Sequence, residues 1–237
     1  MSDFFKTAKN TTSDQAPPAA PAATVILLRE ASESFEVLLL LRAKAIQFAG
    51  GNWVFPGGRI DPADYKSNPD DEIAAARVAA ARESSEEAGL TLNSEEFSFF
   101  SHWTTPLIEK KRFSTWFLWS EISRDQSIVV DEGEIVDHLW VTPSDAIQMM
   151  RRKEIKILPP TFLTLYELAQ CSNIDDVQTM TSSRELPRYF PNLVLHEKTP
   201  GILLENDSGY DSGDMDHNGV KQRVIMGKSG WEFIDET

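Results

Sequence analysis

The stretch that most constrains this chain runs from Gly57 to Leu90. It ends with three carboxylates and one arginine within about one and a half helical turns. On a helix with about 3.6 residues per turn, Glu83, Glu86 and Glu87 occupy positions i, i+3 and i+4, so their carboxylates share one face. Like charges this close repel one another and require a cation nearby. Arg82, four residues before Glu86, supplies one positive charge.

A divalent metal ion is the second cation that this cluster predicts. Its ligands would be the carboxylates of Glu83, Glu86 and Glu87, without His or Cys, and an all-oxygen set favours a hard ion, Mg²⁺ or Mn²⁺. Mg²⁺ usually keeps several waters and meets a substrate phosphate. The alternative is a solvated glutamate-rich helix face, which is the usual fate of a charge run.

The segments that flank the cluster favour the metal site. Residues 53–58, WVFPGG, are typical of a buried strand that ends in a tight turn, and Gly89 is typical of a helix C-cap. Gly57 and Gly58 allow positive φ angles and let backbone amides approach an anion. A plain turn is the alternative, but the adjoining glutamate helix favours a substrate-binding role for Gly58.

Residues 82–90, RESSEEAGL, resemble the second half of the Nudix box, REUxEExGU, in which U is a bulky aliphatic residue. Ser84 stands where that family has an aliphatic residue, and Ala74 stands where it has the first glutamate of the box. The chain also has about ten residues more between Gly58 and Arg82 than the family spacing. Glu72 or Asp71 is therefore the candidate for the missing carboxylate.

Three further segments resemble the branch of this family that contains the peroxisomal coenzyme A diphosphatases. They are VFPGGRIDPAD at residues 54–64, WTTP at residues 103–106 and KRFSTWF at residues 111–117. Together the resemblance covers about residues 22–170. It implies an α/β fold, the Nudix-type α/β/α sandwich with a mixed β-sheet, followed here by a small C-terminal extension.

The resemblance also implies an activity, namely metal-dependent hydrolysis of a diphosphate in a nucleoside diphosphate derivative. Coenzyme A or acyl coenzyme A is the first substrate class, because the branch acts on it. The coenzyme A motif is only partly present, since Arg42 is kept but Phe48 lies near the place of its second arginine. An ADP-ribose or NADH diphosphatase and a non-catalytic ligand sensor therefore stay as alternatives.

The expected site residues follow from the matched motifs. Glu83, Glu86 and Glu87 would hold the metal, and Arg82 would keep these glutamates in register. Glu83, Arg82 and Glu134 form the expected catalytic set. By resemblance, Glu134 corresponds to the acidic residue that precedes the tryptophan strand in this branch, with Glu132 as the reserve. Glu134 or one of the box glutamates would accept the proton of the attacking water.

Two arginines are candidates for binding the substrate phosphates. Arg42 ends an apolar run, and Arg112 precedes the alternating segment Phe113 to Trp119. A guanidinium on a strand end can reach a phosphate and bind it bidentately. The alternative is that both are ordinary surface cations.

Composition limits the partners and the compartment. The 237 residues carry a formal net charge of −14 without a basic stripe, so we expect no nucleic-acid binding and a small anionic substrate. A single cysteine, Cys171, fits a reducing compartment. We expect no membrane span or signal peptide, and residues 234–237 do not match a peroxisomal address, so a cytoplasmic location is expected. The family resemblance allows a homodimer.

The chain is expected to divide into three regions. These are a flexible Pro/Ala-rich tail at residues 1–23, the Nudix domain at residues 24–170 and an extension at residues 171–237. The domain should open with a hairpin of Thr24 to Leu28 and Phe35 to Arg42, and a later helix should follow Ser144 as its N-cap. The extension should hold short strands around an acidic loop at residues 206–219, which we expect to be disordered.

Overall fold

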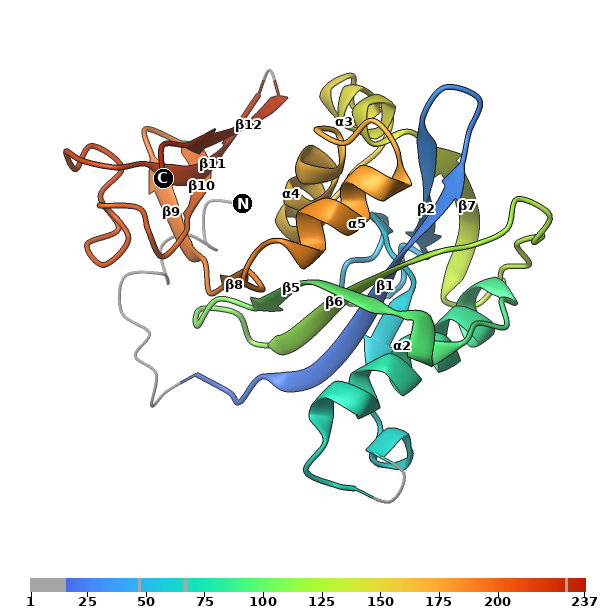
Figure 1. Cartoon of the computed structure of the whole chain (residues 1–237). Coiled ribbons are helices and arrows are strands. Elements are labelled where there is room, and N and C mark those ends of the chain that lie inside the picture. The colour runs from blue at the N-terminus through green and yellow to red at the C-terminus, as the bar shows by residue number, and fades with distance from the viewer. Residues whose placement is uncertain (1–15, 47, 66–67, 229) are drawn as a thin grey trace. The chain divides into compact units, whose positions relative to one another are not determined.

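The structure is a computed structural model that describes residues 16–46, 48–65, 68–228 and 230–237 (Figure 1). The chain divides into two compact units. Of the described residues, those within 21–102 and 115–187 form the larger unit, and those within 16–20, 103–114 and 188–237 form the smaller unit.

The larger unit is built on a sheet whose strands follow the order β3-β2-β1-β6-β5, with β4 paired to β1 and β7 paired to β2. The strands are β1 (Ala20–Glu30), β2 (Phe35–Arg42), β3 (Trp53–Val54), β4 (Gly57–Arg59), β5 (Ser98–Thr104), β6 (Phe113–Glu121) and β7 (Ile135–Val141). The helices are α2 (Glu72–Ala88), α3 (Pro143–Arg151), α4 (Pro159–Leu168) and α5 (Ile174–Ser182), with short 3₁₀ turns η2 (Pro62–Tyr65) and η3 (Ser94–Glu96).

The sheet is mixed. Strand β1 is antiparallel to β2 and to β4. Its bonds to the β6 segment join Ala20 to Arg112 and Leu28 to Ile122, so these two strands run in the same direction. The expected mixed α/β fold is confirmed.

Helices cover both faces of this sheet, with α2 on one face and α3, α4 and α5 on the other (Figure 1). Alternate residues of β1 and β2 pack with the alanine-rich face of α2; they are Val25, Leu27, Leu38 and Leu40. The residues between them, Ile26, Leu28, Val37 and Leu39, are equally buried. Successive side chains of a strand point to opposite faces, so a strand buried on both faces appears in the sequence as a continuous apolar run.

Two element boundaries differ from the sequence prediction. Strand β1 begins at Ala20 rather than at Thr24, because residues 22–24 pair with β4. The N-cap of α3 is Thr142 rather than Ser144, since Pro143 occupies the first turn and the Thr142 hydroxyl accepts the backbone N–H of Asp145 over 3.2 Å. Residues 1–15 of the expected tail lie outside the described residues, and the three-region division stays a prediction.

The smaller unit contains β8 (Arg188–Tyr189) and a four-stranded antiparallel sheet in the order β12-β11-β10-β9. Its strands are β9 (Asn192–His196), β10 (Thr199–Leu203), β11 (Gln222–Gly227) and β12 (Gly230–Asp235). The acidic loop between β10 and β11 is held by the buried pair Asp207–Arg223, so the expectation of a disordered loop is wrong. Within the described residues, the helices are too short or too polar to cross a membrane.

Candidate active site

Helix α2 carries the predicted carboxylates in its last two turns. The Asp71 carboxylate caps its first turn by accepting the backbone N–H of Ala74 over 2.9 Å. At its other end Gly89 adopts φ 68°, and its N–H bonds to carbonyls of the last turn, which confirms the predicted C-cap. Ser84 is fully buried, and its hydroxyl donates to the Ala80 carbonyl over 2.7 Å, so this polar side chain is satisfied within the helix.

The glycine turn lies directly against these carboxylates. The backbone N–H of Gly57 donates to Glu87 Oε2 over 2.9 Å. A Cβ atom at Gly58 would overlap the Glu83 carboxylate. A side chain at Gly58 would therefore displace the Glu83 carboxylate from its present position at the end of α2. This contact supports the interpretation of the Gly57–Gly58 turn as part of the site.

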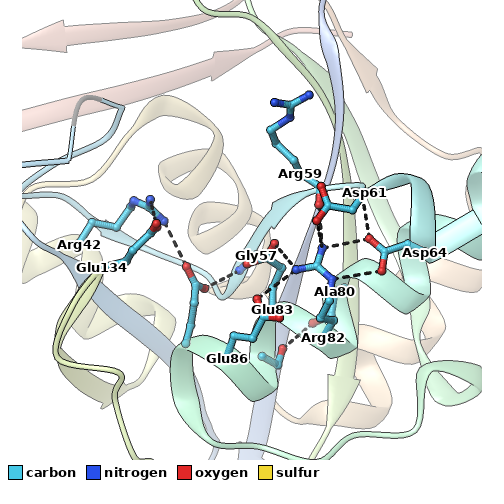
Figure 2. Close-up of polar contacts among 12 residues, drawn as sticks. Arg42, Gly57, Arg59, Asp61, Asp64, Ala80, Arg82, Glu83, Glu86 and Glu134 are labelled. Atoms are coloured by element: carbon cyan, nitrogen blue, oxygen red, sulfur yellow. Dashed lines mark hydrogen bonds and ion pairs between the residues drawn. The ribbon is translucent and has the colours of Figure 1, made fainter.

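Arg82 is the centre of the polar network around α2 (Figure 2). Its guanidinium contacts two box glutamates through Nη1, Glu83 over 2.8 Å and Glu86 over 3.1 Å. It also donates to both oxygens of Asp64, over 3.1 and 3.0 Å, and to the carbonyl of Arg59 over 3.0 Å. The hydrogen bonds from Arg82 to Asp64 raise the pKa of this arginine well above its usual range. Arg82 is thus a fixed cation that orients two of the glutamates.

Sequence reasoning missed Asp64, which supplies the carboxylate expected from Glu72 or Asp71. Asp64 lies on η2, is only 4% exposed and also accepts the backbone N–H of Asp61 over 2.8 Å. Glu72 instead accepts the indole N–H of Trp116 over 2.8 Å, and Asp71 is used as the helix cap. The sequence signal for Asp64 was the polar segment DPAD at residues 61–64. This segment lies in the inserted loop, to which the helical periodicity of the box glutamates does not extend.

The structure also brings Arg42 into contact with Glu87 and Glu134; Figure 2 shows Arg42 beside Glu134. Arg42 Nη1 lies 3.2 Å from Glu87 Oε1, and Arg42 Nη2 lies 2.8 Å from Glu134 Oε2. Strand pairing explains why Arg42 lies next to Glu134, because β2 pairs with β7 and places Arg42 opposite Ile135, the residue after Glu134. Glu132, the reserve candidate, lies in the exposed turn before β7.

Burial controls the protonation of the box glutamates. Glu87 is 5% exposed, and desolvation by burial raises its pKa to about 8, although the Gly57 N–H and Arg42 oppose this shift. Burial also raises the pKa of Glu83, against the stabilising effect of Arg82 on the carboxylate. A cation that enters this cluster would therefore displace a proton.

The donor set suits a hard metal ion, because it consists of carboxylate oxygens alone. In the described residues, no three acidic, His or Cys side chains are placed to hold an ion as they stand. Each box glutamate has one oxygen on an arginine: Glu83 and Glu86 on Arg82, and Glu87 on Arg42. To bind a metal ion, these glutamate side chains would therefore have to rotate away from the arginines. The helix that carries them is capped at both ends, by Asp71 and by Gly89.

Two other arginines differ in their surroundings. Arg112 belongs to the smaller unit, where it is 8% exposed and donates to the carbonyls of Thr105 and Pro17 over 3.0 and 2.8 Å. Its role in substrate binding stays a prediction. Arg59, which sequence reasoning did not single out, is exposed on β4 next to Gly58 and extends away from the α2 carboxylates (Figure 2).

Residues 18–161 match the family described as the NUDIX domain, which is more than half of the chain. The chain belongs to the Nudix family. The predicted family membership is therefore confirmed, and the chain also resembles proteins named acyl-coenzyme A diphosphatases.

Among curated proteins, the acyl-coenzyme A diphosphatase NUDT19 of Xenopus laevis is 29% identical over 135 residues, which cover 53% of this chain and 35% of the relative. The Homo sapiens protein of the same name is 28% identical over 116 residues, which cover 47% and 31%. This Nudix chain thus spans about a third of the length of these relatives.

Among solved structures, a NUDIX hydrolase from Alicyclobacillus acidocaldarius superposes with a TM-score of 0.60 at 22% identity, covering 68% of this chain and 96% of that chain. At this identity the likeness concerns the fold alone.

Proposed function

We propose that this Nudix protein hydrolyses the diphosphate bond of a nucleoside diphosphate derivative, with coenzyme A or acyl coenzyme A as its first substrate class. The observation that carries the proposal is the placement of Arg82 and the three box glutamates at the end of α2, against the Gly57–Gly58 turn. The similarity to relatives named acyl-coenzyme A diphosphatases supports the choice of substrate.

Mg²⁺ or Mn²⁺ would be held by Glu83, Glu86 and Glu87. Bound there, the ion would neutralise diphosphate charge and lower the pKa of a bound water. The chain itself would position these ligands. Asp64 would still hold Arg82 by two hydrogen bonds if the side chains of Glu83 and Glu86 rotated toward an ion.

Glu134 is the proposed general base. Its side chain is 59% exposed, so water can reach it, and Arg42 fixes one of its oxygens. The carboxylate would accept the proton of the attacking water, and Arg42 would bind a substrate phosphate. Most of the rate enhancement would then come from positioning and electrostatics.

Two alternatives each have an observation in their favour. A diphosphatase for ADP-ribose or NADH is favoured by Phe48, which lies near the place of the second arginine of the coenzyme A motif. A ligand sensor without turnover is favoured by the arginine-bound state of all three box glutamates. A cytoplasmic location and a homodimer stay predictions.

The test is hydrolysis of coenzyme A, acetyl coenzyme A, ADP-ribose and NADH with Mg²⁺ or Mn²⁺, with products identified by mass spectrometry. Coenzyme A should yield 4′-phosphopantetheine and adenosine 3′,5′-bisphosphate. Glu86→Gln should abolish turnover at nearly constant side-chain volume, whereas Glu121→Gln, at an exposed end of β6, should not change it.

The outcomes separate the candidates. Cleavage of ADP-ribose or NADH alone would keep the reaction and change the substrate. Ligand binding without cleavage of any compound would favour the sensor. Turnover at the wild-type rate in folded Glu86→Gln would remove Glu86 from the proposed metal site.

A further inference from the structure

A cavity of about 280 Å³ lies in the larger unit, and none of the box glutamates lines it. Its walls come from α2, β5, α5 and the segment after α5. Helices α2 and α5 lie on opposite faces of the sheet, so the cavity is situated where both helices reach β5, the outer strand of this unit's sheet order (Figure 1).

Two arginines line the cavity and stack on neighbouring aromatic rings. The Arg77 guanidinium carbon lies 5.1 Å from the centre of the Phe99 ring, and that of Arg184 lies 5.2 Å from the centre of the Phe100 ring. Phe99 and Phe100 are successive residues of a strand, so their side chains point to opposite faces. In a stacked pair, the flat face of the guanidinium lies against the aromatic ring. Its N–H groups point outward in the guanidinium plane, where they can donate hydrogen bonds.

The hydrogen-bond donors of these arginines are incompletely satisfied. Arg184 pairs with Glu167 over 2.8 Å and donates to the Phe100 carbonyl over 3.2 Å, but its buried Nε has no partner. Arg77 Nε is also buried without a partner, and no acceptor for the Arg77 guanidinium is found among the described residues. A buried guanidinium N–H without an acceptor is unfavourable, so a ligand that supplied an acceptor at these Nε atoms would satisfy them.

The cavity lining is positive although the chain is acidic overall. It contains both arginines and no aspartate or glutamate, in a chain of formal net charge −14. Its volume of about 280 Å³ lies just below the range for small-molecule sites, roughly 300–1,000 Å³, so only a small ligand would fit. A small ligand with a negatively charged group thus matches both the size and the charge of the cavity.

We propose that this cavity binds a small ligand through an oxyanion, a phosphate or a carboxylate group, with Arg77 as the main contact and Arg184 as the second. The site is separate from the box glutamates. Arg77 precedes Glu83 by six residues, so it lies about 9 Å away along the helix axis and is turned by about 240° around it. The group bound here is therefore not the diphosphate that the box glutamates would face.

The test is a titration of the full-length, ¹⁵N-labelled protein with inorganic phosphate in one arm and acetate in the other, followed by NMR of the arginine Nε–Hε groups and the α5 amides. EDTA throughout excludes binding through a metal at the glutamates. Arg77, Arg184 and α5 signals should shift saturably in at least one arm. Saturation with phosphate or with acetate identifies the class of oxyanion, and the absence of saturation in both arms would overturn the proposal.

Arg77→Gln should weaken the anion affinity by about tenfold or more, measured on the α5 amides, because it removes a charged donor. Arg152→Gln is the matched control, since Arg152 is exposed at the end of α3 and pairs with Glu154. Arg77→Lys keeps the charge but loses the planar guanidinium, so its anion affinity should lie between those of the wild type and Arg77→Gln. The lysine variant replaces Arg77→Gln in the test if the glutamine variant does not fold. Unchanged affinity in a folded Arg77 variant would contradict the assignment.

Discussion

Arg82 and Asp64 form a two-point ion pair, with Nε 3.1 Å from one carboxylate oxygen and Nη2 3.0 Å from the other. The pair joins helix α2 to the short turn η2, eighteen residues earlier in the chain. Because the same guanidinium contacts Glu83 and Glu86, its orientation determines where these two carboxylates lie. Asp64 is therefore a positioning residue for the glutamate cluster.

Asp64→Asn should reduce Mg²⁺ affinity or turnover by roughly 10- to 100-fold, as is typical when the partner of a metal-site residue is removed. The amide can accept from only one of the two donors, so Arg82 would be free to rotate toward the glutamates. The measurement is the Mg²⁺ dependence of hydrolysis for the substrate that the wild type cleaves, together with Mg²⁺ binding by calorimetry.

Asp61→Asn is the matched control for this prediction. Asp61 lies 3.9 Å from Arg82, and its side chain is 60% exposed, so the pair is long and solvated. Its loss should change activity by no more than about threefold. Equal losses in the two variants would show that Asp64 has no special role in positioning Arg82.

Metal binding should become tighter as the pH rises toward 8. Burial raises the pKa of Glu87 to about 8 in the metal-free protein, so this carboxyl group is mostly protonated at neutral pH. Since a metal binds the carboxylate, the proton must leave, and each pH unit below 8 weakens binding by up to about tenfold. Calorimetry at pH 7 in buffers of different ionisation enthalpy should detect the release of about one proton per ion.

Glu87→Gln tests the source of this proton. The variant should bind the metal more weakly, and its proton release should fall toward zero because the amide does not titrate. Glu121→Gln, at the exposed end of β6, should release the same proton as the wild type. Full proton release in the Glu87 variant would assign the raised pKa to another group.

The glutamate helix could be predicted from the sequence because its information is local. The spacing of Glu83, Glu86 and Glu87 fixes a common helix face, and Gly89 marks the helix end in the sequence. The continuous apolar runs of β1 and β2 likewise indicated strands buried on both faces, which the structure confirms.

Contacts that depend on strand register and loop shape could not be derived in this way. Arg42 and Glu134 were each named from the sequence, but their 2.8 Å contact depends on the pairing of β2 with β7 across 92 residues. Asp64 lies on the short turn η2 in the inserted loop, outside the helical periodicity of the glutamates, so the polar DPAD segment alone could not identify it as the partner of Arg82. The Thr142 cap of α3 could have been read from Pro143, since proline favours the first helical position.

Glu134→Gln should lower kcat by about 10²- to 10⁴-fold, the range for loss of a general base, while changing KM far less. The amide keeps the size of the side chain and an acceptor for Arg42, but it cannot take a proton from water. Steady-state kinetics at saturating metal, compared between the wild type and the variant, should show the loss in kcat and not in KM.

Glu132→Gln tests whether the general base is Glu134 or Glu132, the other glutamate before β7. Glu132 is exposed at φ 57° before β7, and Glu134 is the residue that bonds to Arg42. We expect Glu132→Gln to keep wild-type kinetics. A large loss of kcat in this variant, with Glu134→Gln active, would transfer the base to Glu132.

The Asp207–Arg223 pair should stabilise the sheet of the smaller unit. The aspartate accepts from Arg223 Nε and Nη2 over 2.7 Å each, and the two side chains are 0% and 3% exposed. Burial by itself would raise the Asp207 pKa, but hydrogen bonds from Arg223 and from the backbone N–H groups of Gly209 and Gln222 outweigh it and hold the pKa below its usual range. The unfolded chain therefore binds this proton more readily than the folded chain, so the stabilisation is present at neutral pH and is lost as the pH falls below about 4.

Asp207→Asn leaves Arg223 buried without its counter-charge and should lower the free energy of opening of this sheet by about 3–5 kcal/mol. Hydrogen exchange followed by mass spectrometry should show faster exchange in β10 and β11. Asp211→Asn, in the same acidic loop at an exposed position, is the control and should leave exchange unchanged. The loss of protection on acidification below pH 4 should be smaller in Asp207→Asn than in the wild type, because the titrating group is gone. Equal protection in both variants at pH 7 would mean that the loop is held by its turns and not by the buried pair.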